Sequence, residues 1–176
     1  MAIPRTSLAF LGACAVSLYG QQPAEKQAAP KIVFVCEHGS AKSIMAAAEF
    51  ARLAKARGLD FLIVSRGTNP DSEIAPGVKQ GLKSDGMDLG SMKPAMVTSS
   101  DLEAATRVIT FGPNLAEWLP KTSPIPSKVL DWSATPSPSK DYTVARDYIR
   151  RQLAALLDDL GRTKNATTGT LAPRPD

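Results

Sequence analysis

Cysteine and histidine are scarce in this chain of 176 residues, which has only two cysteines and one histidine. The cysteines are Cys14 and Cys36, and the histidine is His38. Two cysteines cannot build the disulfide framework of a small secreted domain. Together with one histidine, they are too few for a cysteine- or histidine-rich zinc site. The sequence therefore gives no reason to expect a metal or another cofactor.

Long basic runs are also missing, and aromatic residues make up only 6% of the chain. Lysine and arginine are scattered, and the formal net charge is a mild +4. This pattern does not favour nucleic-acid binding, although it suits an anionic substrate. The apolar share of 43% and the charged share of 22% are typical of one folded domain with a hydrophobic core.

No apolar run is long enough to cross a membrane. The longest, residues 8–19, has about a dozen residues, whereas a membrane span needs about 20. Arg5 precedes this run and polar residues follow it, a pattern that predicts a signal peptide over residues 1–20. We expect an exported protein, periplasmic or secreted, with residues 21–30 as a linker. The alternatives are a lipoprotein anchored through Cys14 and a frayed cytosolic tail.

Strand and helix patterns alternate over residues 31–160, which we expect to form the folded domain. Short apolar, β-rich runs predict strands, and amphipathic or alanine-rich stretches predict helices. The expected strands are residues 31–35, 61–65, 107–111 and 128–130, and the expected helices are 43–57, 75–84, one starting near 101, 114–119 and 142–160. We expect an α/β fold, an open four-stranded parallel sheet with helices on both faces, followed by a disordered tail over residues 161–176.

Cys36 directly follows the first expected strand, at the sheet edge where ligands of such folds bind. The loop that it starts continues with Glu37, His38, Gly39, Ser40, Ala41, Lys42 and Ser43. The first N–H groups of the following helix have no internal partner and favour a negative charge. Gly39 lets the loop amides curl around an anion, Lys42 adds a positive charge, and Ser43 can cap the helix and donate to the sulfur. We predict that this phosphate-binding loop holds an oxyanion, which the Cys36 thiolate attacks.

Each residue of this loop also has a simpler interpretation. Free cysteine is commonly an ordinary buried thiol, and Lys42 alone would be a solvated lysine at a helix start. His38 either contacts the substrate, adjusts the thiol or only fills the loop. The combination of Cys36, Gly39 and Lys42 with a following helix favours the oxyanion-binding interpretation.

Residues 31–160 resemble the low-molecular-weight protein tyrosine phosphatase family, including its arsenate reductase branch. The family signature is a cysteine, five residues, an arginine and then Ser or Thr, and Cys36, Lys42 and Ser43 occupy these places. Further similar segments are Ser65-Arg66-Gly67-Thr68, Gly86-Met87-Asp88-Leu89, Lys93-Pro94 and Val108-Ile109-Thr110-Phe111-Gly112. The resemblance implies that Cys36 forms a phosphocysteine, that the loop amides and residue 42 hold the oxygens, and that an aspartate on a late loop protonates the leaving group.

The chain departs from the family pattern in three places. Lys42 replaces the arginine and cannot bind two oxygens in a bidentate manner. The Asp-Pro of the late loop is not evident in residues 132–136. Asp131 is our candidate acid because it follows the fourth expected strand, and Asp141, which looks like a helix N-cap, is the alternative. Ala41 stands where the family has a second loop cysteine.

The expected function is that of a cysteine-dependent phosphatase that acts on a phosphorylated substrate. One alternative is an arsenate reductase that uses an external thiol, because Cys36 is the only cysteine left after signal removal. The other is a catalytically weak or dead domain that binds a small oxyanion such as phosphate or arsenate. Cys36 favours the two enzymes, whereas Lys42 and the missing Asp-Pro favour the binding domain.

Overall fold

The computed structural model describes residues 28–119 and 128–168, with side chains up to residue 162. The expected signal peptide, Cys14 and most of the expected linker lie outside the described residues, as do residues 169–176. The elements are β1 (Lys31–Cys36), α1 (Lys42–Ala56), β2 (Leu62–Gly67), α2 (Pro76–Ser84), α3 (Ser99–Glu103), β3 (Arg107–Thr110), β4 (Val129–Asp131) and α4 (Tyr142–Thr168). None of the described helices combines the length and apolar character of a membrane span.

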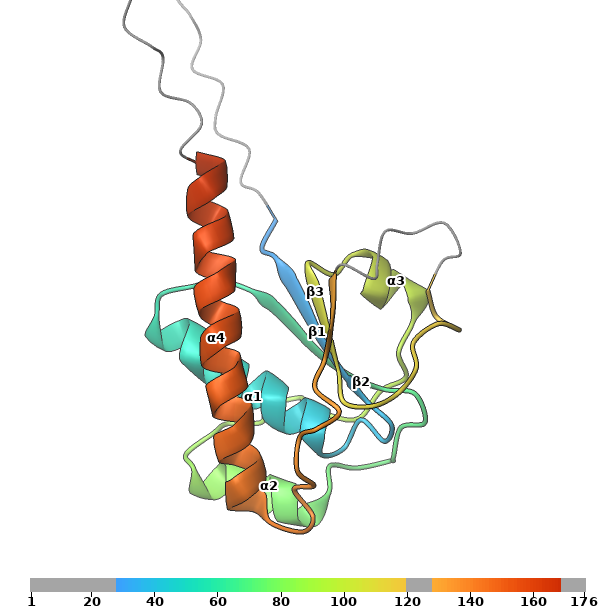
Figure 1. Ribbon diagram of the computed structural model, residues 1–176. Coiled ribbons are helices and arrows are strands. Elements are labelled where there is room, and N and C mark those ends of the chain that lie inside the picture. Colours follow the sequence, from blue (N-terminus) through green and yellow to red (C-terminus); the bar gives the residue numbers. More distant parts are fainter. Residues whose placement is uncertain (1–27, 120–127, 169–176) are drawn as a thin grey trace, which may run out of the picture.

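The four strands form one parallel sheet in the order β2-β1-β3-β4. Helices α1, α2 and α4 lie on one side of the sheet and α3 lies on the other (Figure 1). This arrangement confirms the predicted open sheet with helices on both faces. The chain leaves β1 toward β2 and leaves β3 toward β4, so the direction of winding reverses between β1 and β3. Ligands of such folds bind at the carboxyl ends of the strands beside this point, where Cys36 lies.

Side chains of β1 alternate between two hydrophobic clusters, one on each face of the sheet. Ile32, Phe34 and Cys36 belong to the cluster that α1 and α4 cover. Val33 and Val35 belong to the smaller cluster on the α3 side. All five residues are buried. Cys36 therefore continues the row of core side chains that faces α1.

The side chain of Asp101 on α3 connects β1 and β2. Its carboxylate accepts hydrogen bonds from Lys31 Nζ of β1 at 2.9 Å and from Arg66 Nε of β2 at 2.7 Å. Burial raises the pKa of this carboxyl, but the hydrogen bonds from Arg66 and Lys31 outweigh burial and hold the pKa below its usual value. An ionised Asp101 thus joins α3, β1 and β2.

Two segments differ from the sequence predictions. The expected helix 114–119 is a turn over residues 116–118, because the Asn114 side chain accepts from the N–H of Ala116 and competes with the helical pattern. Helix α4 continues beyond residue 160 to Thr168, into the expected disordered tail, since a helix anchored by core packing propagates easily. Asp141 accepts from the N–H of Val144 and caps α4, as we predicted.

Candidate active site

Cys36 ends β1 with its thiol unbridged and its side chain almost fully buried. Its Sγ lies 3.1 Å from Ser43 Oγ on α1. Ser65 Oγ on β2 donates to Ser43 Oγ at 3.0 Å. Because Ser65 supplies the hydrogen in that bond, Ser43 is left to donate its own hydrogen to the sulfur. The two hydroxyls are thus arranged so that Ser43 can donate a hydrogen bond to the Cys36 sulfur.

The backbone of the Cys36 loop, residues 36–43, turns its carbonyl groups outward. The carbonyl oxygens of Cys36, Glu37, His38 and Ser40 accept from the N–H groups of Thr68, Asn69, Asp71 and Ala75, at 2.8 to 3.2 Å. In the described part of the chain, no backbone acceptor pairs with the N–H groups of residues 37–42. The segment after β2 thus holds the carbonyls, which leaves a run of N–H groups for an anion.

Two glycines allow this loop to lie directly on the end of β2. Gly39 has φ +62°, a left-handed conformation that favours glycine, as we predicted. A Cβ on Gly39 would lie 3.0 Å from the backbone N of Gly67, and a Cβ on Gly67 would lie 2.7 Å from the backbone N of Gly39. Gly67 had appeared in the sequence only as part of a family resemblance. Its structural role is to let the two backbones touch.

Lys42 and Ser43 begin α1, but only one of the two roles assigned to Ser43 is present. The N-cap of α1 is Ala41, and no side chain caps this helix. The prediction that Ser43 caps the helix is therefore wrong, because Ser43 is already inside the first turn and its hydroxyl pairs with the sulfur. Lys42 is partly exposed and makes no hydrogen bond or ion pair within the described residues. Its ammonium group is available to an anion in the loop.

The side chains of His38 and Ser40 both contact Asp71, which lies outside the Cys36 loop. Ser40 Oγ donates to Asp71 Oδ2 at 2.5 Å. The half-exposed His38 lies between two carboxylates, 3.5 Å from Asp71 and 3.8 Å from Glu37. Sequence reasoning missed Asp71, for which the only signal was its place in a turn after β2. To an anion, residues 37–41 can therefore offer their backbone N–H groups.

The structure does not bring Asp131 to Cys36. Trp132 belongs to the cluster that contains Cys36, and Leu130 packs against it. Because side chains alternate between the two faces along a strand, Asp131 points toward the opposite face of the sheet. Its carboxylate is already used locally, since it accepts from the N–H and the Oγ of Ser133 at 2.8 and 3.2 Å. Asp131 thus caps its own turn instead of facing the thiol.

A groove of about 360 Å³ opens beside the Cys36 loop. Three of its lining residues adjoin Cys36. Glu37 follows it in the chain, Thr68 donates its N–H to the Cys36 carbonyl, and the N–H of Phe111 donates to the carbonyl of Val35. The groove therefore follows the carboxyl edge of the sheet beside the start of the Cys36 loop. Among the described residues, no three His, Cys, Asp or Glu side chains gather as they would around a metal ion.

Replacing Ser43 tests whether its hydroxyl stabilises the thiolate. We expect Ser43→Ala to slow alkylation of Cys36 by iodoacetamide at neutral pH by about three- to tenfold, the effect of one lost hydrogen bond to a charged group. Peptide mass spectrometry separates Cys36 from Cys14. Ser65→Ala should have a smaller effect, because Ser65 acts through Ser43. Equal alkylation rates in wild type and Ser43→Ala would contradict this role.

Comparison with known proteins bears on the fold and the family. Residues 31–132 match the sequence profile of the low molecular weight phosphotyrosine protein phosphatases. No curated protein sequence gives a significant match. A protein tyrosine phosphatase from Entamoeba histolytica is 19% identical with a TM-score of 0.67, over 77% of this chain and 99% of that one. A thioredoxin-dependent arsenate reductase from Corynebacterium glutamicum is 24% identical with a TM-score of 0.66, over 79% of this chain and 65% of that one.

A low molecular weight protein tyrosine phosphatase from Bacillus subtilis is 19% identical with a TM-score of 0.63, over 76% of this chain and 99% of that one. At such identities, these structures establish the fold, and the profile match over residues 31–132 establishes the family. The chain belongs to the low molecular weight phosphotyrosine protein phosphatase family.

Proposed function

We propose that this chain is a cysteine-dependent phosphatase that hydrolyses phosphomonoesters through a phosphocysteine on Cys36. One observation carries the proposal. A buried thiol with a hydroxyl oxygen at 3.1 Å lies at the start of a loop whose N–H groups have no backbone acceptor within the described residues. The same few residues thus provide a nucleophile and a cradle for the oxygens of the group it attacks.

Two displacements at phosphorus complete the reaction. The Cys36 thiolate attacks phosphorus, so an S–P bond forms as the bond to the leaving oxygen breaks. Water then attacks the phosphocysteine, which releases inorganic phosphate and returns the electron pair to sulfur. In both steps the loop N–H groups and Lys42 neutralise the non-bridging oxygens. Ser43 stabilises the thiolate when it is the leaving group of the second step.

Proton transfer is the weak part of this site. Asp131, the acid expected from the sequence, faces away from Cys36 and is hydrogen-bonded to Ser133. General acid catalysis is worth about 100- to 10,000-fold in rate. We therefore propose an enzyme of modest activity that favours substrates with good leaving groups. Aryl phosphates are such substrates, because their aryloxide departs without first taking up a proton.

Exchange of Lys42 for arginine tests the oxyanion cradle. We expect Lys42→Arg to raise kcat/KM for an aryl phosphate by about tenfold, because a guanidinium binds two phosphoryl oxygens where an ammonium binds as a point charge. Steady-state assays of wild type and variant measure the ratio. Unchanged or lower activity would show that the loop is shaped around lysine, and no turnover by wild type would contradict the proposed function.

Arsenate reduction with an external thiol is the second candidate. The cradle binds tetrahedral oxyanions of either kind, and Cys36 is the one free cysteine among the described residues. Reduction of arsenate to arsenite needs two electrons, so two external thiols must be oxidised to a disulfide in each cycle. Arsenite formation with a small thiol, without turnover of aryl phosphate, would favour this candidate.

Export is a proposal that rests on residues 1–20, where Arg5 precedes a short apolar run. We expect the mature chain to lack these residues and to lie in the periplasm or outside the cell. Mass spectrometry of the protein from its native host measures the N-terminus. A cytosolic chain that begins at Met1 or Ala2 would refute export, and a lipid on Cys14 would support anchoring.

A further inference from the structure

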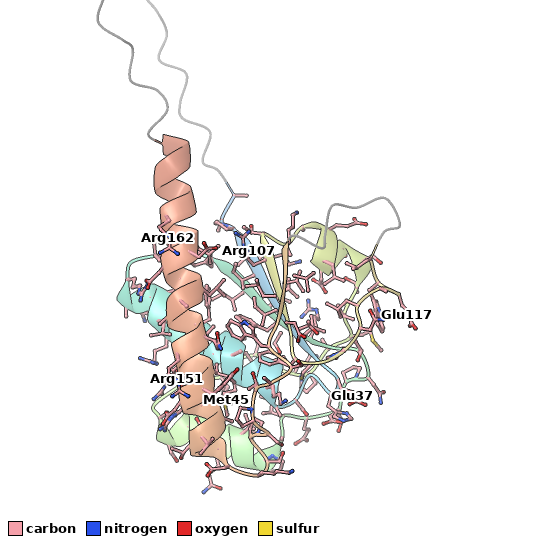
Figure 2. All side chains as sticks on the ribbon, in the orientation of Figure 1. Glu37, Met45, Arg107, Glu117, Arg151 and Arg162 are labelled. Atoms are coloured by element: carbon pink, nitrogen blue, oxygen red, sulfur yellow. The ribbon has the colours of Figure 1, made fainter. Side chains whose placement is uncertain are left out.

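Among the residues that the structure describes, the lining of the groove beside the Cys36 loop has two glutamates and no basic side chain. Glu37 and Glu117 both line it, and Figure 2 shows both on the side of the molecule away from α4. The Glu37 side chain is 68% exposed, and the His38 ring lies 3.8 Å from its carboxylate. Glu117 is exposed and makes no hydrogen bond or ion pair within the described residues. This acidity is local, since the whole chain has a formal net charge of +4.

An anionic groove next to a phosphate cradle disfavours a substrate that brings only negative charge. A phosphoryl group held by the loop N–H groups would contact the backbone N–H of Glu37, which has no backbone acceptor within the described residues. Like charges at this spacing repel, whereas a cation on the substrate reverses the sign of the interaction. The partly exposed Trp118 adds aromatic surface to the lining, on which lysine stems and arginine planes pack well.

We infer that this groove selects phosphorylated peptides in which lysine or arginine lies next to the phosphorylated aromatic residue. The inference rests on the proposed phosphatase activity and names its substrate class. Glu117 is the specificity-determining residue that lies outside the catalytic loop. Glu37 contributes from within the loop, where its N–H also belongs to the anion cradle.

The test compares phosphotyrosine peptides of equal length whose flanking residues are basic, neutral or acidic. We expect wild type to have its highest kcat/KM with the basic peptide and its lowest with the acidic one. Glu117→Gln should reduce the ratio of kcat/KM for the basic peptide to kcat/KM for the acidic peptide by about three- to fivefold. This is the effect expected from the loss of one solvent-exposed charge interaction. The neutral peptide and a plain aryl phosphate should react as in wild type. Added salt should weaken the preference.

Glu103→Gln provides the matched control, because Glu103 is also exposed but lies on α3 and does not line the groove. It removes the same charge from the chain and should leave the ratio unchanged. An equal fall in both variants would show an effect of net charge alone and would overturn the inference. A wild-type ratio near one, with normal turnover of aryl phosphate, would overturn it while leaving the phosphatase activity intact. Absence of turnover with aryl phosphate would overturn the proposed function itself.

Discussion

Cys36→Ser lowers kcat for an aryl phosphate by about 10,000-fold or more, as expected when the nucleophile of a covalent mechanism is lost. Serine has nearly the same size as cysteine and can keep the hydrogen bond with Ser43. Its hydroxyl is not ionised near neutral pH, so it is a poor nucleophile without a base beside it. Steady-state assays of wild type and variant give the ratio.

The loss must come from chemistry and not from folding or binding. Cys36→Ser should retain the thermal unfolding midpoint of wild type and should still bind inorganic phosphate, because the cradle is made of backbone N–H groups. Assayed on the full-length chain of 176 residues, Cys14→Ser is the matched control, since it removes the other cysteine and should retain full activity. A Cys36→Ser variant that turns over at the wild-type rate would exclude a role of the thiol as nucleophile.

Arg150→Met reduces the free energy of unfolding by about 3 kcal/mol, because it leaves a buried carboxylate with part of its charge uncompensated. Glu49 of α1 has a fully buried side chain, and Arg150 of α4 lies 2.6 Å from it. Arg52 is the other partner of Glu49, at 2.9 Å, but is 43% exposed. Arg150 also reaches Asp85, which ends α2, at 3.4 Å. The ion pair therefore joins the three helices that cover one face of the sheet.

A second variant distinguishes the loss of stability caused by one unpaired buried charge from the net contribution of the ion pair to the free energy of unfolding. The double variant Glu49→Leu/Arg150→Met should recover most of the lost stability, because two apolar side chains replace both charges together. Asp158→Asn is the control. It breaks the pair between Arg57 and Asp158, which also joins α1 to α4 but is solvent-exposed, and should cost less than about 1 kcal/mol. Denaturant unfolding measures all three. Equal losses in Arg150→Met and Asp158→Asn would contradict the account.

Much of the fold could be predicted from the sequence because its signals are local. The apolar runs around Val33, Ile63 and Val108 indicated parallel strands, and the alternation with helices indicated the open sheet. The length of α4 could not be read from hydrophobic periodicity, because the helix runs past its last core leucine, Leu160. The turn after Asn114 was missed because one side-chain hydrogen bond outweighed a helical pattern.

The site could be predicted only where its parts are neighbours in the chain. Cys36 and Gly39 lie in one short segment, and their placement follows from a strand, a loop and a helix in succession. Ser65 and Asp71 reach this loop from across the sheet, 22 and 31 residues away from their partners. Such contacts leave no local pattern. The direction of Asp131 depended on strand register, where a shift of one residue reverses the face.

The central claim is that the phosphoryl group passes through a covalent bond to Cys36. Without a well-placed base to activate water, breakdown of the phosphocysteine should be slow, so the intermediate should accumulate on substrates with good leaving groups. Rapid acid quench of wild type during turnover of an aryl phosphate, followed by peptide mass spectrometry, should find one phosphoryl group on the peptide that contains Cys36. A phosphoryl group on another residue, or turnover by an enzyme whose Cys36 has been fully alkylated beforehand, would contradict the account.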